Sequence, residues 1–275
     1  MDNQEQLSES SGSTYQPEEE LSHTDKMTGI LTEPSSTFEK ISKFPLKTSD
    51  WLLPVVILFL VISLTQILVM TNDEINFQVK QKQNEQLQKT FDNMVESGQL
   101  TREQANQQME TAKERMAMSQ GPIGWIFQTI GIFIFGFIAF FLVVTIHFAF
   151  SRFALRGNGN FKSALVPNGL AAYISIIQVI LTAIVAMSLG KLMSDLSVAS
   201  LAGIEKSTFA GWALGKLEPF SIWAYSVVSI GLAKMFRSDS KGKYFLLVFG
   251  VWILGSLLLW GIGKSVSFLS FLAEM

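Results

Sequence analysis

The sequence predicts an all-α, polytopic membrane protein with five transmembrane helices and a helical hairpin outside the membrane. Two observations point to this fold class: long apolar segments, and a long polar stretch between the first two of them. The apolar segments are residues 51–70, 123–150, 164–190, 219–236 and 244–263. Each is near or above the roughly 20 residues that a helix needs to cross a bilayer. Within them the only Asp, Glu, Lys or Arg is Lys234. Since lipid offers no hydrogen-bond partner to a backbone amide, these segments must be helical.

Composition excludes several classes of function. Of the chain, 48% is hydrophobic and the net charge is −2, so no strongly basic surface indicates nucleic-acid binding. There is no cysteine, which excludes disulfides, iron–sulfur clusters, thiolate zinc sites and cysteine nucleophiles.

The N-terminal fifth of the chain is polar. Residues 1–26 are rich in Gln, Glu and Ser and contain few aromatic residues, so we expect a disordered tail that is not a secretory signal. Residues 27–50 form a short amphipathic segment next to the membrane, in which Pro34–Ser42 is typical of a short helix. Phe38 and Ile41 either face the bilayer from this helix or belong to a simple connector.

Residues 71–122 are predicted to form a helical hairpin outside the membrane. Apolar residues recur there at helical spacing on both sides of Ser97-Gly98, and Thr101-x-x-Gln104 matches a capping box. We favour a hairpin that shields its own apolar stripe; the alternative is a docking surface for a partner or a second copy.

Residues 191–218, between the third and fourth apolar segments, are moderately apolar, and we expect them to lie along the membrane interface. Small residues in this part and in the apolar segments mark candidate positions for close helix packing. They are Gly211, Gly215, Ser229, Ala233, Gly131, Gly136, Gly250 and Gly255.

The distribution of Lys and Arg predicts the orientation. Cations are densest in the short stretches 151–162 and 237–243, and further lysines precede the first apolar segment. Since cytoplasmic loops are enriched in Lys and Arg, we expect a cytoplasmic N-terminus. The C-terminus and the 71–122 hairpin would then lie on the opposite side.

The search for chemistry is negative. No phosphate-binding loop, nucleophile elbow or cluster of metal ligands is present, so we expect no catalytic, cofactor or metal site and no enzyme. His147, near the end of the second apolar segment, is expected to be an interfacial histidine. Amides and hydroxyls in the apolar segments either fix helix packing, which we favour, or line a polar path; the amides are Gln66, Gln128, Gln178 and Asn168.

Three stretches resemble the bacterial members of the Yip (Ypt-interacting protein) domain family. They are Leu217–Ala233, the basic loop 237–243 followed by the segment containing Trp252, and Pro34-x-x-x-Phe38-x-x-Ile41. The resemblance covers most of residues 27–270 and implies five spans with a cytoplasmic N-terminus. Eukaryotic relatives are scaffolds that bind Rab-type GTPases, but this chain lacks their Asp-Leu-Tyr-Gly-Pro signature. The resemblance carries over no catalytic residue.

Together these observations favour a non-enzymatic membrane scaffold or adaptor that organises proteins or lipids, in the bacterial cell membrane. Its partners would be the lipid bilayer and proteins, or a second copy, contacting the 71–122 hairpin or the small-residue helix faces. A transporter or channel for a small solute is the alternative, and no nucleic-acid partner is expected.

Overall fold

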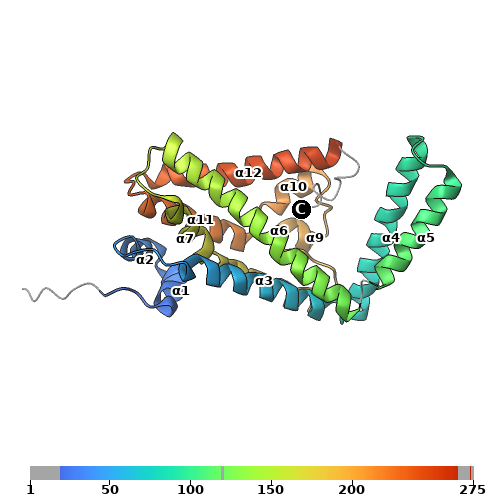
Figure 1. Ribbon diagram of the computed structural model, residues 1–275, viewed down its shortest axis with the longest axis horizontal. Helices are drawn as coiled ribbons and strands as arrows, with labels where there is room; N and C mark the ends of the chain where they lie inside the picture. Colours follow the sequence, from blue (N-terminus) through green and yellow to red (C-terminus); the bar gives the residue numbers. More distant parts are fainter. Residues whose placement is uncertain (1–18, 119–120, 266–272, 274–275) are drawn as a thin grey trace, which may run out of the picture.

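The chain forms a bundle of helices that run along one long axis (Figure 1). The computed structural model describes residues 19–118, 121–265 and 273. Every regular element in that part of the chain is a helix, so the predicted all-α class is confirmed.

The elements follow the sequence in this order: α1 (His23–Thr32), α2 (Pro34–Ile41), α3 (Ser49–Val69), α4 (Asp73–Glu96), α5 (Arg102–Met118), α6 (Pro122–Ala149), the π-helical turn η1 (Phe150–Ala154), α7 (Phe161–Leu170), α8 (Ala172–Leu189), α9 (Val198–Ala202), α10 (Phe209–Gly215), α11 (Pro219–Met235) and α12 (Lys241–Ser265).

Four helices or helix pairs are long and apolar enough to cross a membrane. Within the described residues these are Ser49–Val69, Pro122–Ala154, Phe161–Leu189 and Lys241–Ser265. They match four of the five predicted spans and support an integral, multi-pass membrane protein. The predicted span 219–236 forms α11, which has 17 residues and is shorter than the other four.

Two predicted spans differ in detail from single straight helices. The segment 164–190 is divided between α7 and α8 by Ala171. Pro167 lies inside α7 and has no N–H to donate, which weakens the helix just before this break. At the end of α6 the helix widens into η1, beyond the predicted end at residue 150.

The N-terminal segment is more ordered than the sequence suggests. Residues 1–18 of the predicted tail lie outside the described residues, but α1 already begins at His23. Its start is fixed by a capping box in which Ser22 and Asp25 bond each other's backbone N–H. The short helix α2 follows directly, as expected around Pro34–Ser42.

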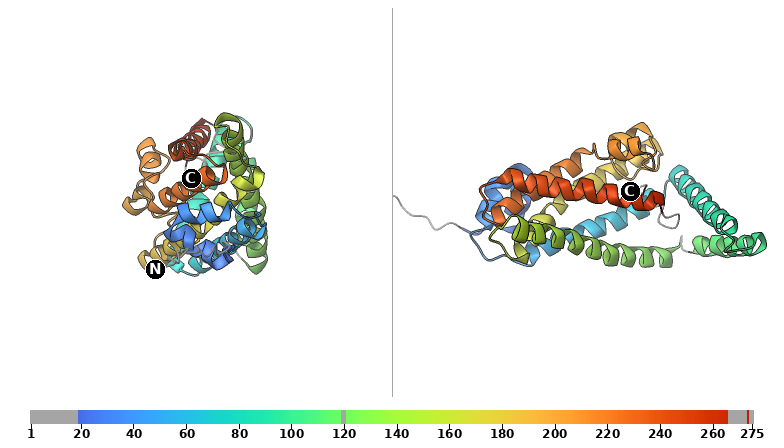
Figure 2. Two further views of the ribbon diagram at one scale, coloured as in Figure 1. Left: turned by 90° about the vertical axis from the view of Figure 1, so that its left-hand side faces the viewer. Right: turned by 90° about the horizontal axis from the view of Figure 1, so that it is seen from above.

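Helix α2 buries its apolar face in protein and does not turn it to the bilayer. Phe38 is fully buried against α11, where its ring lies close to Gly231, and Ile41 is almost fully buried. The Lys234 ammonium on α11 lies 2.5 Å from the Glu39 carboxylate. The hydrogen bond and charge of Lys234 hold the pKa of the Glu39 carboxyl below its ordinary value. Helices α1 and α2 therefore form a cap on this end of the bundle (Figure 2).

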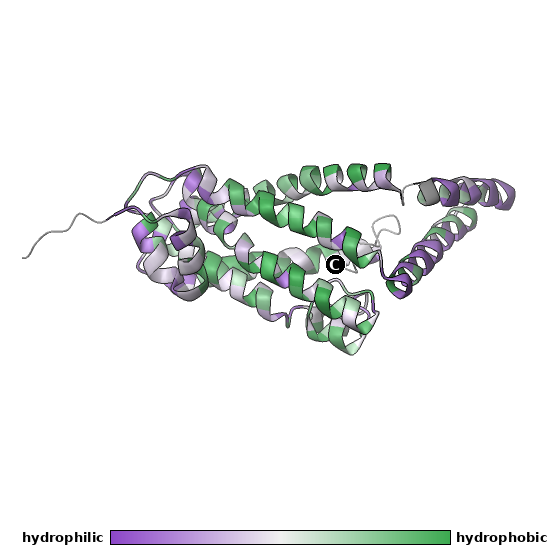
Figure 3. Ribbon diagram, turned by 90° about the horizontal axis from the view of Figure 1, so that it is seen from below, coloured by the Kyte–Doolittle hydropathy of each residue, from purple (hydrophilic) through white to green (hydrophobic). Residues whose placement is uncertain are grey.

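Helices α4 and α5 form the predicted hairpin, which extends beyond the other end of the bundle and is largely hydrophilic (Figure 3). Thr101 and Gln104 make the expected reciprocal capping bonds, of 3.0 and 3.2 Å. Ala105 is buried between the helices, and Asp92 pairs with Arg102. The hairpin is joined to the bundle at its base, where the Gln78 amide bonds the backbone of Gly190 and Leu192.

Burial is uneven along the bundle. The main apolar core lies at the end capped by α1 and α2 and draws on α7, α11 and the start of α12. Only 6% of the most apolar stretch of α6, and 6% of that of α12, is buried inside the described chain. The helices are therefore closely packed at the capped end and less so near the hairpin, where a cavity opens.

Candidate functional site: a polar cavity between three helices

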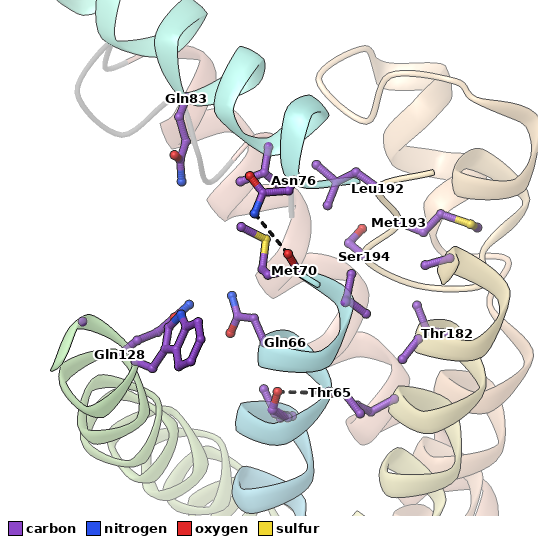
Figure 4. Close-up of a pocket in the computed structure, with 18 of the residues that line it drawn as sticks. Thr65, Gln66, Met70, Asn76, Gln83, Gln128, Thr182, Leu192, Met193 and Ser194 are labelled. Carbon is purple, nitrogen blue, oxygen red and sulfur yellow. Dashed lines mark hydrogen bonds between the residues drawn. The ribbon is translucent and has the colours of Figure 1, made fainter. Parts of the chain in front are cut away.

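A cavity of about 1040 Å³ lies between α3, α6 and α8, next to the base of the hairpin. Figure 4 shows side chains from these helices, from the start of α4 and from the segment after α8 converging on it. Its volume is at the upper end of what small-molecule sites usually offer.

One face of each helix lines the cavity. On α3 the lining residues follow helical spacing through Ile62, Thr65, Gln66 and Val69. On α8 they include Gln178 and Thr182 with alanines of the same face, and on α6 they are its N-terminal residues with Gln128. The structure thus brings Gln66, Gln128 and Gln178 to one place, which spacing along the sequence does not reveal.

Thr182 has an unused hydroxyl at this cavity. Its side chain is 7% exposed, and its Oγ1 atom has no hydrogen-bond partner in the described chain. A threonine in a membrane helix usually bonds the carbonyl one turn back, as Thr65 does to Val61 at 2.8 Å. A buried hydroxyl without a partner costs free energy, so Thr182, whose Oγ1 is enclosed in this structure, is an unsatisfied polar group beside the cavity.

A second cavity of about 320 Å³ lies further towards the capped end, and Gln178 lines both. Asn168, Ser175 and Gln178 line this second cavity, and Thr182 the first. Ser175, Gln178 and Thr182 are spaced along one face of α8, whereas Asn168 lies on α7, before the break at Ala171. The two cavities share the lining residue Gln178.

A buried histidine lies next to Asn168. His147 is 1% exposed, and its Nδ1 lies 3.0 Å from Oδ1 of Asn168, whose amide also donates to the Ala164 carbonyl. The sequence predicts an interfacial histidine here; the structure encloses the ring because α7 packs against the end of α6.

These groups offer hydrogen bonds but little reactivity. No group of three or more His, Cys, Asp or Glu that could hold a metal ion occurs among the described residues. The cavity is suited to binding a polar group, and among the described residues that line it no nucleophile is paired with a base.

Comparison with known proteins identifies the family. The sequence model of the Yip1 domain matches residues 28–262, from within α1 to the end of α12. The chain belongs to the Yip1 domain family. The resemblance seen in the sequence is therefore confirmed at family level. Searches among curated proteins and among solved structures give no match.

Some of the predicted packing residues lie at close contacts of this Yip1 domain. An ideal Cβ on Gly136 would come within 2.6 Å of the Phe59 ring, where α6 meets α3. Ser229 and Ala233 are fully buried on α11. Gly211 packs against the backbone carbonyl of Glu205.

The other predicted packing residues are less enclosed. A Cβ on Gly215 would meet the Lys206 side chain at 3.7 Å, an ordinary contact. Nothing in the described chain lies within 4 Å of a Cβ built on Gly131, Gly250 or Gly255. These three positions are open in the described chain, so their role in packing stays a prediction.

Two glycines that sequence reasoning missed also make close helix contacts in the Yip1 domain. A Cβ on Gly169 would lie 2.4 Å from the Cα of Trp51, and one on Gly231 would lie 2.7 Å from Phe38 and Pro167. Gly169 follows Pro167-Asn168, a sequence typical of a turn, so its packing role has no local signal.

Proposed function

We propose that this Yip1-domain protein is a non-enzymatic membrane scaffold with five spans and a cytoplasmic N-terminus, in the bacterial cell membrane. The observation that carries the proposal is the α4–α5 arm, which extends from the bundle and packs mainly on itself. Such an arm presents a large polar surface at a distance from the membrane helices, as a docking element does.

The five-span arrangement counts α11 as the remaining crossing. At about 1.5 Å per residue its 17 residues reach about 26 Å, close to the ~30 Å of a hydrocarbon core. The link after η1 and the link between α11 and α12 both lie at the capped end, where the backbone N–H of Asn158 donates to the backbone carbonyl of Phe236. An odd number of crossings then places the C-terminus and the hairpin opposite the N-terminus.

The charge distribution supports the proposed orientation. The capped end carries the cations of the two short links, namely Arg152, Arg156, Lys162, Arg237, Lys241 and Lys243. Arg156 and Arg237 both follow helix ends with positive φ, at 55° and 53°. These cations agree with a cytoplasmic location for the capped end.

The scaffold proposal predicts a specific neighbour of the hairpin. A photo-crosslinking amino acid at the exposed positions Lys89 and Gln107 should give discrete protein adducts in intact cells. The matched control is Leu246 on α12, which is 78% exposed and faces lipid in the proposed arrangement. Adducts at the hairpin and none at Leu246 would support docking. If the probe at both hairpin positions gave only the monomer without crosslinked adducts, docking would be contradicted.

A solute transporter is the second candidate, and one observation favours it: the polar side chain of Gln178 lines both cavities. If the protein is a transporter, liposomes that contain the purified protein should take up a polar solute faster than protein-free liposomes. Gln178→Leu should slow this uptake. The control is Thr145→Val, since Thr145 is exposed on α6 and bonds its own helix. Flux equal to that of empty vesicles across a solute panel would reject this function.

A further inference from the structure

The larger cavity joins two kinds of surface. Amide and hydroxyl groups of Gln66, Gln128 and Thr182 line part of it, while Ile62 and Phe127 belong to its apolar lining. A polar solute would leave the apolar part unfilled, and a hydrocarbon would leave the amides unpaired. The lining therefore matches a molecule with a polar head and an apolar body.

Arg115 gives the polar part a positive charge. Among the described residues that line the cavity it is the one charged residue, and it lies in the last turns of α5. Its guanidinium has no hydrogen-bond or ion-pair partner within the described residues, and it is solvent-exposed. A guanidinium of this kind is suited to phosphate, which it can bind through two parallel hydrogen bonds.

The start of α6 adds a second positive contribution. Gly121 caps this 28-residue helix without a side-chain hydrogen bond, and Pro122 occupies its first turn. Ile123 and Gly124, whose N–H groups have no carbonyl one turn back, line the cavity. The positive end of the helix dipole thus faces the same space as Arg115.

Thr182 adds an unsatisfied hydroxyl beside the cavity, which a ligand could reach if this side chain rotated about χ1. It is buried to more than nine-tenths, lines the same cavity from α8, and has no partner. A hydroxyl donor, an arginine and a helix N-terminus around one cavity form a set of donors for an anion.

We propose that this cavity binds the phosphate-bearing headgroup and upper acyl chains of one phospholipid, taken from the leaflet on the hairpin side. Phosphate is held by Arg115 and the α6 N-terminus, the Thr182 hydroxyl bonds an ester or headgroup oxygen, and the acyl chains lie on the apolar lining. A lipid fits better than a soluble phosphate ester because α6, which forms one wall, exposes most of its apolar surface to the bilayer. The proposal does not depend on the scaffold function.

The test uses the full chain in nanodiscs of phosphatidylglycerol with a photoactivatable acyl-chain analogue. Crosslinked peptides identified by mass spectrometry should include Ile62–Val69 of α3 and Gln178–Ala186 of α8. Arg115→Gln should lower this crosslinking about tenfold, as expected for loss of a charged hydrogen bond. Thr182→Val should lower it about threefold, since a neutral bond is weaker.

Two variants serve as controls. Lys113→Gln removes a charge from the same helix at an exposed position outside the cavity lining, and Thr145→Val removes a hydroxyl that faces away from it. Both should crosslink like the unchanged protein. Because Arg115 is exposed and Thr182→Val keeps the side-chain shape, monodisperse protein is expected from all four variants.

The outcomes distinguish the possible sources of phosphate. The proposal would be overturned if Arg115→Gln and Thr182→Val left the crosslinking unchanged. It would also be overturned if the crosslinks mapped only to outward-facing residues of α12, since either result indicates ordinary boundary lipid. Removal of the crosslink by millimolar glycerol 3-phosphate would assign the cavity to a soluble phosphate ester and overturn the lipid. Crosslinking that resists the soluble ester and falls in both cavity variants would establish the lipid site.

Discussion

The Lys26 ammonium lies 2.9 Å from the Asp50 carboxylate, and both side chains are almost fully buried. This ion pair joins α1 to the first turn of α3. The other oxygen of Asp50 accepts the backbone N–H of Lys47 at 3.2 Å, and Glu20 lies 3.5 Å from Lys26. The N-terminal cap is therefore fastened to the first span by a charge pair, in addition to the apolar contacts of α2.

Breaking this pair on one side should destabilise the protein strongly. Lys26→Met or Asp50→Asn leaves a buried group without its charged partner, which costs about 3–5 kcal/mol in comparable cases. We expect a clear drop in the unfolding temperature of the detergent-solubilised protein, measured by tryptophan fluorescence.

The double substitution Lys26→Met with Asp50→Leu should recover much of this loss, because no unpaired charge remains. Lys47→Met is the surface control: Lys47 pairs with Glu20 but is 57% exposed, so its removal should change little. Equal unfolding temperatures for all these variants would show that the pair contributes nothing to holding the cap.

Gly169→Ala should clearly destabilise the protein, although the substitution adds only one methyl group. A methyl group there would press on the Trp51 backbone, which cannot move without shifting α3 against α7, at a cost of about 1–3 kcal/mol. Gly131→Ala is the matched control in an open helix position and should be neutral or stabilising. Thermal unfolding in detergent measures both; a similar shift for the two would contradict the close contact of α3 and α7.

Ser229→Leu should disturb the packing of α11. The neighbouring Val227 is also buried, so Ser226 on the same helix serves as the control. Ser229 is 0% exposed, whereas Ser226 is partly exposed, and both hydroxyls bond their own helix. We expect Ser229→Leu to lower the unfolding temperature by several degrees more than Ser226→Leu. The reverse order would place lipid at Ser229.

The segment between α8 and α10 should loosen in acid. Burial disfavours the charge of Asp195, but hydrogen bonds from Lys206, Ser200 and Ser197 outweigh it and hold the pKa of its carboxyl below the ordinary value of 3.8. A lowered folded-state pKa stabilises this segment fully above pH 3.8, and the stabilisation is lost as the pH falls towards the lower value.

Hydrogen exchange of residues 191–208 in detergent measures this effect. Protection should be greater at about pH 5 than at about pH 3 after correction for intrinsic rates, and Asp195→Asn should remove the difference. Protection that is independent of pH in the unchanged protein would rule out the carboxylate as the organising group.

The apolar core at the capped end shows the limit of sequence reasoning. The run of apolar residues in each span was sufficient to predict helices, but Phe38 and Lys26 lie in polar stretches that gave no sign of burial. Their burial depends on α11 and α3, which are distant in sequence. The same holds for Gly169, whose partner Trp51 lies on another helix.

The sequence by itself determined the helical membrane class, four of the spans and the polar hairpin, because hydropathy and helical spacing are properties of neighbouring residues. Only the tertiary structure decided which faces meet, since lipid and protein interior are equally apolar and a membrane helix carries no strong signal of its inner side. The gathering of Gln66, Gln128, Gln178 and Thr182 around one cavity is a consequence of those contacts.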